Sequence, residues 1–422
     1  MKRSRCWVIA TDMGYGHQRA AFSLRKLALQ SRVLSANAYP GISAADALIW
    51  NELKLVYETV SRMQQVPVFG SALFHLFDRL QKIREFYPVD RPIGESTLQL
   101  KQTYALMESF NWGRHLIEKL NKNPLPIVTT FPIVALMAEH WGYGGNIYLV
   151  VTDADIARSW VSRHPAKSRI RYFVPSKLAK SRLQRYGVIG RSIKTTGFPL
   201  PQELIGKNQA VVRRDTARRI LRLDPAGRTL AKYRLLLVSL LGPLPRLRSK
   251  KPVVITFAVG GAGAQLDIAR AAAKSLGPAM KKGDVHMNVT LGIRTSLVSK
   301  LKFDIPRQVS LFAFPTKEKY FSHFNSLMRS TDILWTKPSE LVFYGALGIP
   351  LVLTPPLGSQ EAQNKKWILN IGAAVNQLEP SLAREWIHDF LEEGTLAEAA
   401  MEGFVEMEKE GVSNIMRALK NP

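Results

Sequence analysis

The sequence predicts an α/β protein built from two doubly wound parallel sheets. Short apolar runs rich in β-branched residues alternate with longer stretches of helical periodicity, and this alternation occurs in two series along the 422 residues. A basic, leucine-rich stretch between the two series fits neither pattern. A chain of this length is expected to form two domains, so we place the domain junction in that stretch, at about 199–251.

Each series contains short predicted strands that alternate with helices. The first comprises 6–11, 32–36, 127–130, 147–152, 170–174 and 193–195, and the second comprises 253–258, 286–291, 309–314, 332–335, 351–354 and 373–376. We therefore expect an N-terminal domain over 1–200 with a helical insertion at about 45–116, a basic apolar linker or insertion over 201–250, a C-terminal domain over 251–395 and a C-terminal helix over 396–422.

The predicted insertion holds an unusual apolar segment that includes Phe69, Phe74 and Phe77. Two interpretations stay open for it. The segment either forms a buried helix pair or presents an exposed apolar surface to a lipid or a protein partner.

The composition indicates a soluble or peripheral protein of a reducing compartment, which we take to be the cytoplasm. The single cysteine, Cys6, excludes an intrachain disulfide. The first residues do not resemble a signal peptide, because Asp12 interrupts a short apolar run. No apolar run approaches the roughly 20 residues that span a bilayer. The histidines and the cysteine lack the spacing of a metal site, so we expect no metal and no cofactor.

The positive charge is concentrated in one part of the chain. The net charge is +26, and residues 158–251 contain 24 Lys or Arg against three acids, a surplus of +21. The stretch 389–410 is acidic instead. A cationic belt attracts an anionic membrane surface or nucleic acid, although a generally basic proteome would also raise the Lys and Arg content. The apolar run 235–241 inside the belt suits shallow membrane insertion; the rival interpretation is a core helix at the junction whose neighbouring charges bind RNA.

A glycine turn follows the first predicted strand and opens a helix. Asp12, Gly14, Gly16 and His17 lie in this turn, where glycine permits close approach to a helix N-terminus. His17 is placed to accept a proton from an acceptor hydroxyl, or it is an exposed histidine at an ordinary corner. The turn lacks the third glycine of the dinucleotide-binding fingerprint, because Arg19 occupies that position.

A buried strand over 147–152 delivers two carboxylates, Asp153 and Asp155, to its carboxyl end. Three roles stay open for Asp153. It could orient His17, bind an acceptor hydroxyl, or cap the segment that follows.

Two regions of the second series suit a nucleotide diphosphate. Gly260, Gly261 and Gly263 form a glycine-rich turn between a strand and a helix, where backbone N–H groups can bind phosphate. Two polar loops leave the carboxyl ends of neighbouring strands further on, at the edge where open α/β sheets bind ligands. These loops carry Lys337, Ser339, Glu340, Ser359, Gln360 and Glu361, which offer a cation for diphosphate and polar groups for ribose hydroxyls. An ordinary βαβ unit with solvated loops is the alternative.

Taken in order, these motifs resemble the two-domain GT-B glycosyltransferases. The elements that carry the resemblance are DMGYGHQRAA, VVTDAD, YFVPSKLAKSRLQRYGV with IKTTGFP, FAVGGAGAQ, and ALGIPLVLTPPLGSQEAQN with NIGAAV. The likeness is clearest to the monogalactosyldiacylglycerol synthases and processive diacylglycerol glucosyltransferases, and more distant to the N-acetylglucosaminyltransferase that makes lipid II. It is poor over 45–116 and 202–251.

The resemblance implies roles for individual residues. His17 would be the catalytic base or an acceptor contact, Gly260, Gly261 and Gly263 would bind the donor pyrophosphate, and Gln360 with Glu361 would contact the donor sugar and nucleotide. Two departures stand out. Lys337-Pro338-Ser339-Glu340 replaces the family's glycine-rich turn, and Gly14-Tyr15-Gly16-His17 replaces Gly-Gly-Gly-His. They mark a divergent member with another donor or acceptor, or one whose activity has changed.

The function that this resemblance implies is transfer of a sugar, with inversion, from a nucleotide-diphosphate sugar such as a UDP-sugar to a lipid such as diacylglycerol. The enzyme would act at the inner face of the membrane, and no nucleic-acid partner is expected. One alternative is an epimerase- or hydrolase-like enzyme acting on a soluble nucleotide sugar. Another is a non-catalytic protein that uses the basic belt to bind a polyanion.

Overall fold

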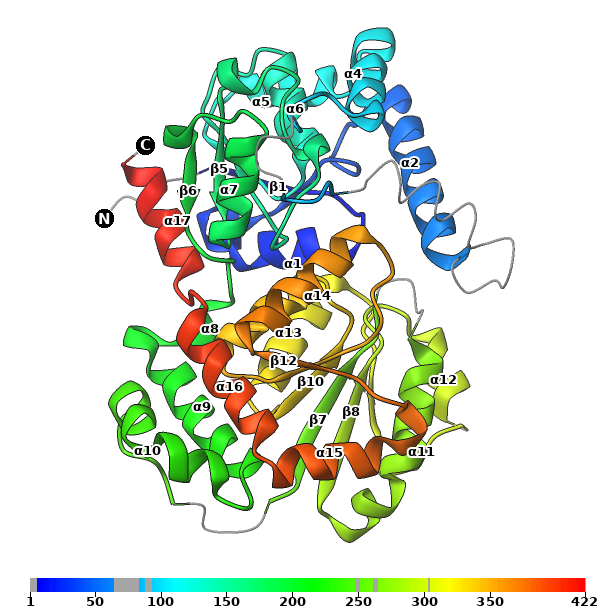
Figure 1. The fold of residues 1–422 in the computed structure, drawn as a ribbon. Coiled ribbons are helices and arrows are strands. Elements are labelled where there is room, and N and C mark those ends of the chain that lie inside the picture. The colour runs from blue at the N-terminus through cyan, green and yellow to red at the C-terminus, as the bar shows by residue number, and fades with distance from the viewer. Residues whose placement is uncertain are drawn as a thin grey trace. The chain divides into compact units, whose positions relative to one another are not determined.

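The chain folds into two compact units, each built around one sheet (Figure 1). The computed structural model describes residues 6–63, 83–87, 93–246, 251–260, 265–302 and 304–421. The first unit comprises Met1–Pro199, Leu357–Gln363 and Glu410–Pro422, and the second comprises Leu200–Pro356 and Asn364–Lys409. The predicted segment that contains Phe69, Phe74 and Phe77 lies outside the described residues.

Both sheets are six-stranded and all their described pairings are parallel, which confirms the predicted fold class. The first sheet has the order β2-β1-β3-β4-β5-β6 and the second β12-β11-β10-β7-β8-β9. The strands are β1 (Trp7–Ala10), β2 (Leu34–Ser35), β3 (Ile127–Thr129), β4 (Ile147–Val150), β5 (Ile170–Val174), β6 (Ile193–Thr195), β7 (Val253–Ala258), β8 (Val285–Thr290), β9 (Ser310–Phe312), β10 (Ile333–Thr336), β11 (Leu351–Leu353) and β12 (Ala374–Asn376).

Helices connect the strands within each unit. The first unit has α1 (Tyr15–Ser23), α2 (Ala44–Met63), α4 (Leu98–Phe110), α5 (Arg114–Asn121), α6 (Pro132–His140), α7 (Lys177–Arg185) and α17 (Gly411–Lys420), with 3₁₀ turns η1 (Arg25–Leu27), η2 (Leu29–Ser31), η3 (Arg158–Trp160), η4 (Pro165–Lys167) and η5 (Gly190–Ser192). The second has α8 (Gln202–Ile205), α9 (Ala210–Leu223), α10 (Arg228–Leu241), α11 (Leu266–Lys282), α12 (Ser296–Lys302), α13 (Lys317–Met328), α15 (Ala383–Glu392) and α16 (Thr395–Glu406), with η6 (Lys207–Gln209), η7 (Glu340–Leu347) and η8 (Pro380–Leu382). Helix α14 (Ser359–Ile371) begins in the first unit and continues into the second.

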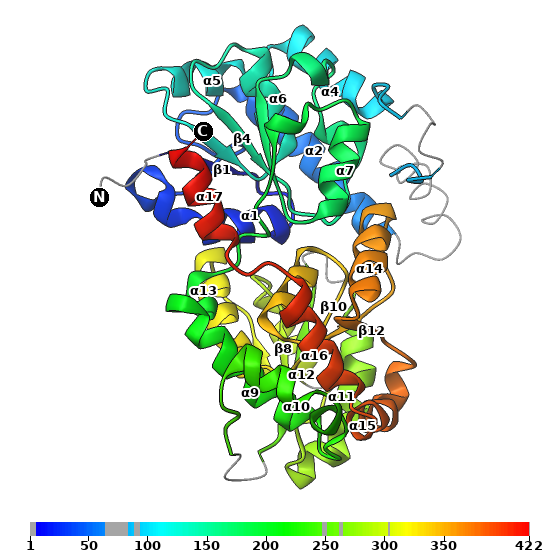
Figure 2. The same cartoon turned by 60° about the vertical axis from the view of Figure 1, so that its left-hand side comes forward.

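The first sheet is covered on both faces, as its continuous apolar strands require. Alternate residues of one strand reach different cores: Ile9 lies in one apolar cluster and Val8 in the other. The cluster that contains Val8 includes residues of α1 and of α17 (Figure 2), among them Ile415, which is fully buried. The last helix of the chain thus completes the core of the first unit.

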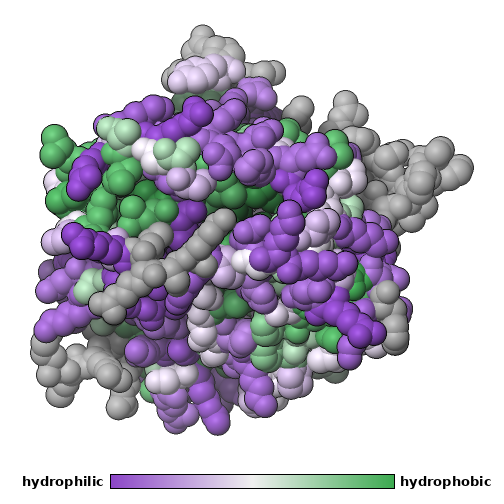
Figure 3. Space-filling model, turned by 90° about the horizontal axis from the view of Figure 1, so that it is seen from below, coloured by the Kyte–Doolittle hydropathy of each residue, from purple (hydrophilic) through white to green (hydrophobic). Residues whose placement is uncertain are grey.

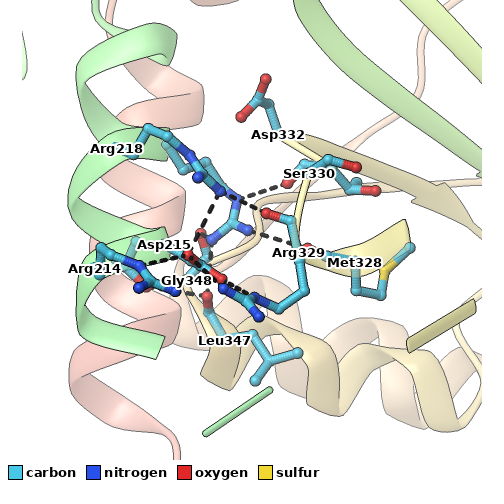
Figure 4. Close-up of polar contacts among 12 residues, drawn as sticks. Arg214, Asp215, Arg218, Met328, Arg329, Ser330, Asp332, Leu347 and Gly348 are labelled. Carbon is cyan, nitrogen blue, oxygen red and sulfur yellow. Dashed lines mark hydrogen bonds and ion pairs between the residues drawn. The ribbon is translucent and has the colours of Figure 1, made fainter. Parts of the chain in front are cut away.

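In the second unit, helix α9 is held by a buried arginine. The guanidinium of Arg219 donates to the backbone carbonyl oxygens of Thr331, Leu347, Gly348 and Met328, at 2.8–3.3 Å. Figure 4 labels three of these acceptor residues, Met328, Leu347 and Gly348. Burial lowers the pKa of Arg219 to about 10. The carbonyl groups still satisfy its donors, so this residue ties α9 to the chain segments that lead into two strands.

The structure divides two stretches differently from expectation. For 201–250 we expected a linker or an insertion; a separate linker is excluded, because the described part of that stretch forms α8, α9 and α10 of the second unit. Residues 396–422 are not one helix, because the chain is extended at Met407 and divides into α16 and α17. Composition does not reveal these features, since both stretches keep a helical pattern and only tertiary packing assigns them to a unit.

Candidate active site

The glycine turn after β1 opens helix α1 as predicted. Gly14 is the N-cap residue and has a φ of 77°, a backbone conformation that favours glycine. His17 follows in the first turn of the helix and is half-buried. The strand, the turn and the helix therefore bring the histidine to the carboxyl edge of the first sheet.

The ring of His17 is held by the loop that follows β3, the strand next to β1. Its Nδ1 atom lies 2.6 Å from the carbonyl oxygen of Thr130. A carbonyl oxygen can only accept a hydrogen bond, so Nδ1 carries the proton and the basic lone pair of the neutral ring is on Nε2. Phe131 packs edge-on against the ring, with the ring centroids 5.0 Å apart, and Trp160 lies 5.9 Å away.

Asp153 is linked to the histidine through Thr152. The hydroxyl oxygen of Thr152 lies 3.3 Å from Nδ1 of His17 and 3.4 Å from a carboxylate oxygen of Asp153. The amide of Gln360, in the segment Leu357–Gln363 of the same unit, donates to that carboxylate. The structure thus brings His17, Asp153 and Gln360 into one hydrogen-bonded group and leaves the predicted roles of these residues as predictions.

The carboxylates of Asp12 and Asp155 at this edge form intramolecular ion pairs and hydrogen bonds. Asp12 forms an ion pair with Lys54 of α2 at 3.0 Å, and its carboxylate also accepts from Gln18. Asp155 is buried and forms a two-pronged pair with Arg182, at 2.8 and 2.7 Å. Asp12 therefore anchors the glycine turn to a helix, and Asp155 stabilises the fold behind Asp153.

Sequence reasoning missed Thr130 and Thr152 as members of this group. Each is the last residue of a predicted buried strand, and parallel strands present their carboxyl ends at one edge. Their place at the carboxyl ends of two predicted strands is the signal from which both threonines could have been predicted as site residues. Threonine is common in strands, however, and only the pairing of β1 with β3 places Thr130 beside His17.

In the second unit, the loops after β7 and β10 meet because the two strands are neighbours. A Cβ atom added to Gly260 would lie 3.1 Å from Cδ and from Cε of Lys337, so the lysine side chain rests directly on this glycine. The backbone N–H of Gly260 donates to the side chain of Gln265 at 3.2 Å. Gly261 and Gly263 lie outside the described residues. The structure therefore places one cation and one glycine of the predicted diphosphate site together.

The segment after Lys337 forms the 3₁₀ helix η7. This helix begins at Glu340, has Ser339 as its N-cap residue and is buried along its whole length. Glu340 is only 7% exposed. A carboxylate is favoured in the first turn of a helix, and it repels a second anion there. Glu340 thus places a negative charge at the start of η7, near the residues predicted to bind diphosphate.

The remaining predicted residues open helix α14. Ser359 is its first residue, and the carboxylate of Glu361 accepts from the backbone N–H of Leu357 at 2.9 Å. This contact orders the loop before the helix. Within the described residues, no three His, Cys, Asp or Glu side chains are grouped to hold a metal ion. No described helix has the length and apolar character needed to cross a membrane.

Comparison with known proteins supports the resemblance. The chain is 23% identical over 384 residues to a processive diacylglycerol β-glucosyltransferase of Bacillus cereus, a match that covers 89% of this chain and 82% of that protein. The same enzyme of Bacillus licheniformis is 25% identical over 275 residues, which is 63% of this chain and 61% of the relative. The chain is a divergent relative of these glycosyltransferases. Residues 304–414 also match a domain family described only as a domain of unknown function, DUF6938.

Solved structures with a similar architecture include MurG of Acinetobacter baumannii and a UDP-GlcNAc 2-epimerase of Neisseria meningitidis bound to UDP-GlcNAc. Each has a TM-score of 0.48 and 14% identity, and each match covers 99% of this chain and 100% of the other. At this level of similarity the two structures do not bear on the activity of this chain.

Proposed function

We propose that this protein is a glycosyltransferase that moves a hexose from a UDP-sugar to a hydroxyl group of a diacylglycerol-type lipid, with inversion at the anomeric carbon. The observation that carries the proposal is the fixed ring of His17, which holds its proton on Nδ1 and therefore its basic lone pair on Nε2. The relationship to diacylglycerol glucosyltransferases supports the choice of acceptor.

The proposed reaction is a single displacement. His17 accepts the proton of the acceptor hydroxyl at Nε2 while the acceptor oxygen attacks the anomeric carbon of the donor. The bond between that carbon and the diphosphate oxygen breaks, and the nucleoside diphosphate leaves with the bonding electrons. Lys337 and backbone N–H groups near Gly260 would stabilise its charge. In this proposal no metal or cofactor is required, and EDTA should leave turnover unchanged.

The test is a transfer assay with purified full-length protein. A panel of radiolabelled UDP-, GDP- and ADP-sugars is incubated with vesicles that contain diacylglycerol, and the lipid and water-soluble products are separated. We expect a labelled glycolipid from a UDP-sugar, with the anomeric configuration inverted by proton NMR. Epimerised or hydrolysed nucleotide sugar without glycolipid would identify an enzyme that acts on soluble substrates. Absence of any product together with absence of nucleotide binding by calorimetry would leave only a binding protein.

We also propose that the enzyme binds the inner face of an anionic membrane, and helix α10 supports this best. Leu235, Leu236 and Val238 on this helix are 88, 43 and 41% exposed. Its cations include the exposed Arg228 and Arg234, and it contains no acidic residue. Figure 3 shows apolar side chains gathered at one side of the lower face of the protein, and α10 lies at the lower left of Figure 1. Exposed apolar side chains between cations are typical of interfacial helices.

Burial removes three arginines of the basic belt of 158–251 from the protein surface. Arg158, Arg182 and Arg219 are buried, so they contribute to the fold and not to a binding surface. Lys232 of α10 forms an ion pair at 2.9 Å with Glu398, which belongs to the acidic stretch. Of the apolar run, Leu237 and Leu241 are buried and anchor the helix.

Vesicle co-sedimentation tests the membrane proposal. Replacing both Leu235 and Leu236 with Ser should weaken binding to anionic vesicles, while the matched change at Leu378, an exposed leucine outside α10, should not. Binding should fall as salt rises, because juxtamembrane cations contribute about 1 kcal/mol each at an anionic surface. A protein that ignores vesicles but shifts RNA at physiological salt would replace the membrane with a nucleic-acid partner.

A further inference from the structure

Two threonines surround the ring and main chain of His17. Thr130 contacts this residue twice: its carbonyl oxygen accepts from Nδ1 at 2.6 Å, and its hydroxyl donates to the backbone carbonyl oxygen of His17 at 2.8 Å. Thr152 places its hydroxyl oxygen 3.3 Å from the same Nδ1 atom. We infer that Thr130 and Thr152 are positioning residues that hold His17 in the tautomer protonated at Nδ1.

Thr130 is itself fixed by the sheet. Its side chain is fully buried, and its backbone N–H donates to the carbonyl oxygen of Ile9 in β1 at 3.2 Å. A two-point contact from a fixed residue sets both the position of the His17 main chain and the direction of its ring. The hydrogen bond from the Thr130 hydroxyl supports the contact at Nδ1, because it keeps the main chain of His17 at the distance where Nδ1 reaches the carbonyl oxygen of Thr130.

Thr152 connects the ring to a charge. The hydroxyl oxygen of Thr152 can accept a hydrogen bond from the Nδ1–H group of His17. The same hydroxyl can donate to a carboxylate oxygen of Asp153, 3.4 Å away. Thr152 is 2% exposed, so water has little access to this link. When Nε2 takes a proton, the ring becomes a cation, and a carboxylate one hydroxyl away favours that charge. The ring is thereby oriented by backbone and hydroxyl groups, with the carboxylate acting from a distance.

This inference rests on the proposed function only for its consequence in catalysis. The tautomer is a property of the folded protein and is measured without substrate. Nitrogen-15 NMR of histidine-labelled protein distinguishes a protonated from an unprotonated ring nitrogen, and His17→Gln identifies the signals of this residue. We expect Nδ1 of His17 to be protonated in the wild type at a pH where the ring is neutral. Protonation at Nε2 instead would overturn the inference.

The variants Thr130→Val and Thr152→Val keep the side-chain volume and remove the hydroxyl. Each should give His17 a measurable share of the Nε2-protonated tautomer and reduce kcat by about 3- to 10-fold, the range expected for one hydrogen bond, with the KM for the donor unchanged. Thr130→Ser and Thr152→Ser should restore both. Thr103→Val is the matched control, because the buried hydroxyl of Thr103 donates to Gln99, away from the site.

Two outcomes separate this inference from the proposed function. If the Nδ1 tautomer is present and shifts in the valine variants, but no sugar is transferred to lipid, the positioning roles stand and the proposed reaction is wrong. If sugar is transferred but the valine variants leave the tautomer and kcat as in the wild type, the two threonines are structural and the inference is wrong. Valine variants that fail to fold would be replaced by Thr→Ala at the same positions, read by the same NMR signals.

Discussion

At the carboxyl edge of the first sheet, a histidine ring is held by hydrogen bonds, whereas at the same edge of the second sheet a lysine side chain lies on a glycine and a buried carboxylate begins the helix that follows the lysine. The first group holds one basic nitrogen in a defined state, through Thr130 and Thr152. The second combines Lys337, which lies on Gly260, with the carboxylate of Glu340 three residues further along the chain. Similar topology therefore presents a basic ring nitrogen in one unit and groups of opposite charge in the other.

The largest effect should come from removing the base of the first edge. His17→Ala should lower turnover by about two to four orders of magnitude, the usual contribution of a general base. Calorimetry should show that the donor nucleotide binds as before, because the predicted diphosphate contacts belong to the second unit. Wild-type turnover in this variant would make His17 a structural residue and remove the contrast between the two edges.

The buried arginines of the two units should respond differently to loss of a nearby carboxylate. Asp155→Asn leaves Arg182 buried without its charged partner and should lower the free energy of unfolding by about 3–5 kcal/mol. Asp215→Asn should lower the free energy of unfolding by less. Asp215 pairs with three arginines, Arg214, Arg218 and Arg329, whose side chains are 33–62% exposed. The buried Arg219 donates to backbone carbonyl groups and so keeps its hydrogen bonds in this variant. Urea unfolding of the two variants measures the difference; equal losses would contradict it.

Binding at the second edge should be sensitive to steric change at Gly260. In Gly260→Val the new side chain must displace Lys337, whose Cδ and Cε atoms would lie 3.1 Å from the added Cβ. We expect the Kd for UDP to rise by about tenfold, equivalent to about 1.4 kcal/mol, with an unchanged melting temperature. Gly283→Val is a poor control because of its positive φ. Gly190→Ala of the first unit serves instead, because its added Cβ would make only an ordinary van der Waals contact with Gln184, at 3.5 Å. Unchanged affinity for UDP would remove the diphosphate assignment.

A substitution at Glu340 tests whether its negative charge affects the binding of a nucleotide diphosphate at the carboxyl edge of the second sheet. Glu340→Gln keeps the shape of the side chain and removes its negative charge from the first turn of η7. If the carboxylate mainly repels the diphosphate, the variant should bind UDP a few-fold more tightly, with a gain that shrinks in high salt. If the carboxylate instead contacts the ribose, as the sequence first suggested, the same titration should show weaker binding.

The smallest effect concerns stability in mild acid. Burial lowers the pKa of His323 in the second unit, and burial together with Arg163 lowers that of His140 in the first. The unfolded chain, with a histidine pKa near about 6.5, then takes up protons before the folded chain does. This contribution to stability is therefore present above that pH and lost as the pH falls below it. The melting temperature of His140→Gln/His323→Gln should decrease less than that of the wild type between pH 7.5 and 5.5, and equal decreases would show that other groups control the response.

The two sheets, nearly all strand positions and the order of the loops at the carboxyl edges could be predicted from the amino-acid sequence. Strand β5 and strand β7, for example, begin and end where the apolar pattern predicted. This was possible because a strand buried on both faces needs a continuous apolar run, which is visible locally. The glycine before His17 was equally visible, since a positive φ at a helix start favours glycine.

Which side chains meet could not be predicted, because it depends on the folding of distant segments against one another. Thr130 is 113 residues from His17 and Thr152 is 135 residues from it, and the strand order that joins them leaves no local trace in the sequence. The sequence also did not show which arginines of the basic belt are buried, or that Glu398 pairs with Lys232. The number of charges can be read along the chain, whereas burial and ion pairing depend on distance in space. Helix α17 shows the same limit: its sequence predicts a helix, and only its apolar contacts with β1 and β4 place it in the first unit.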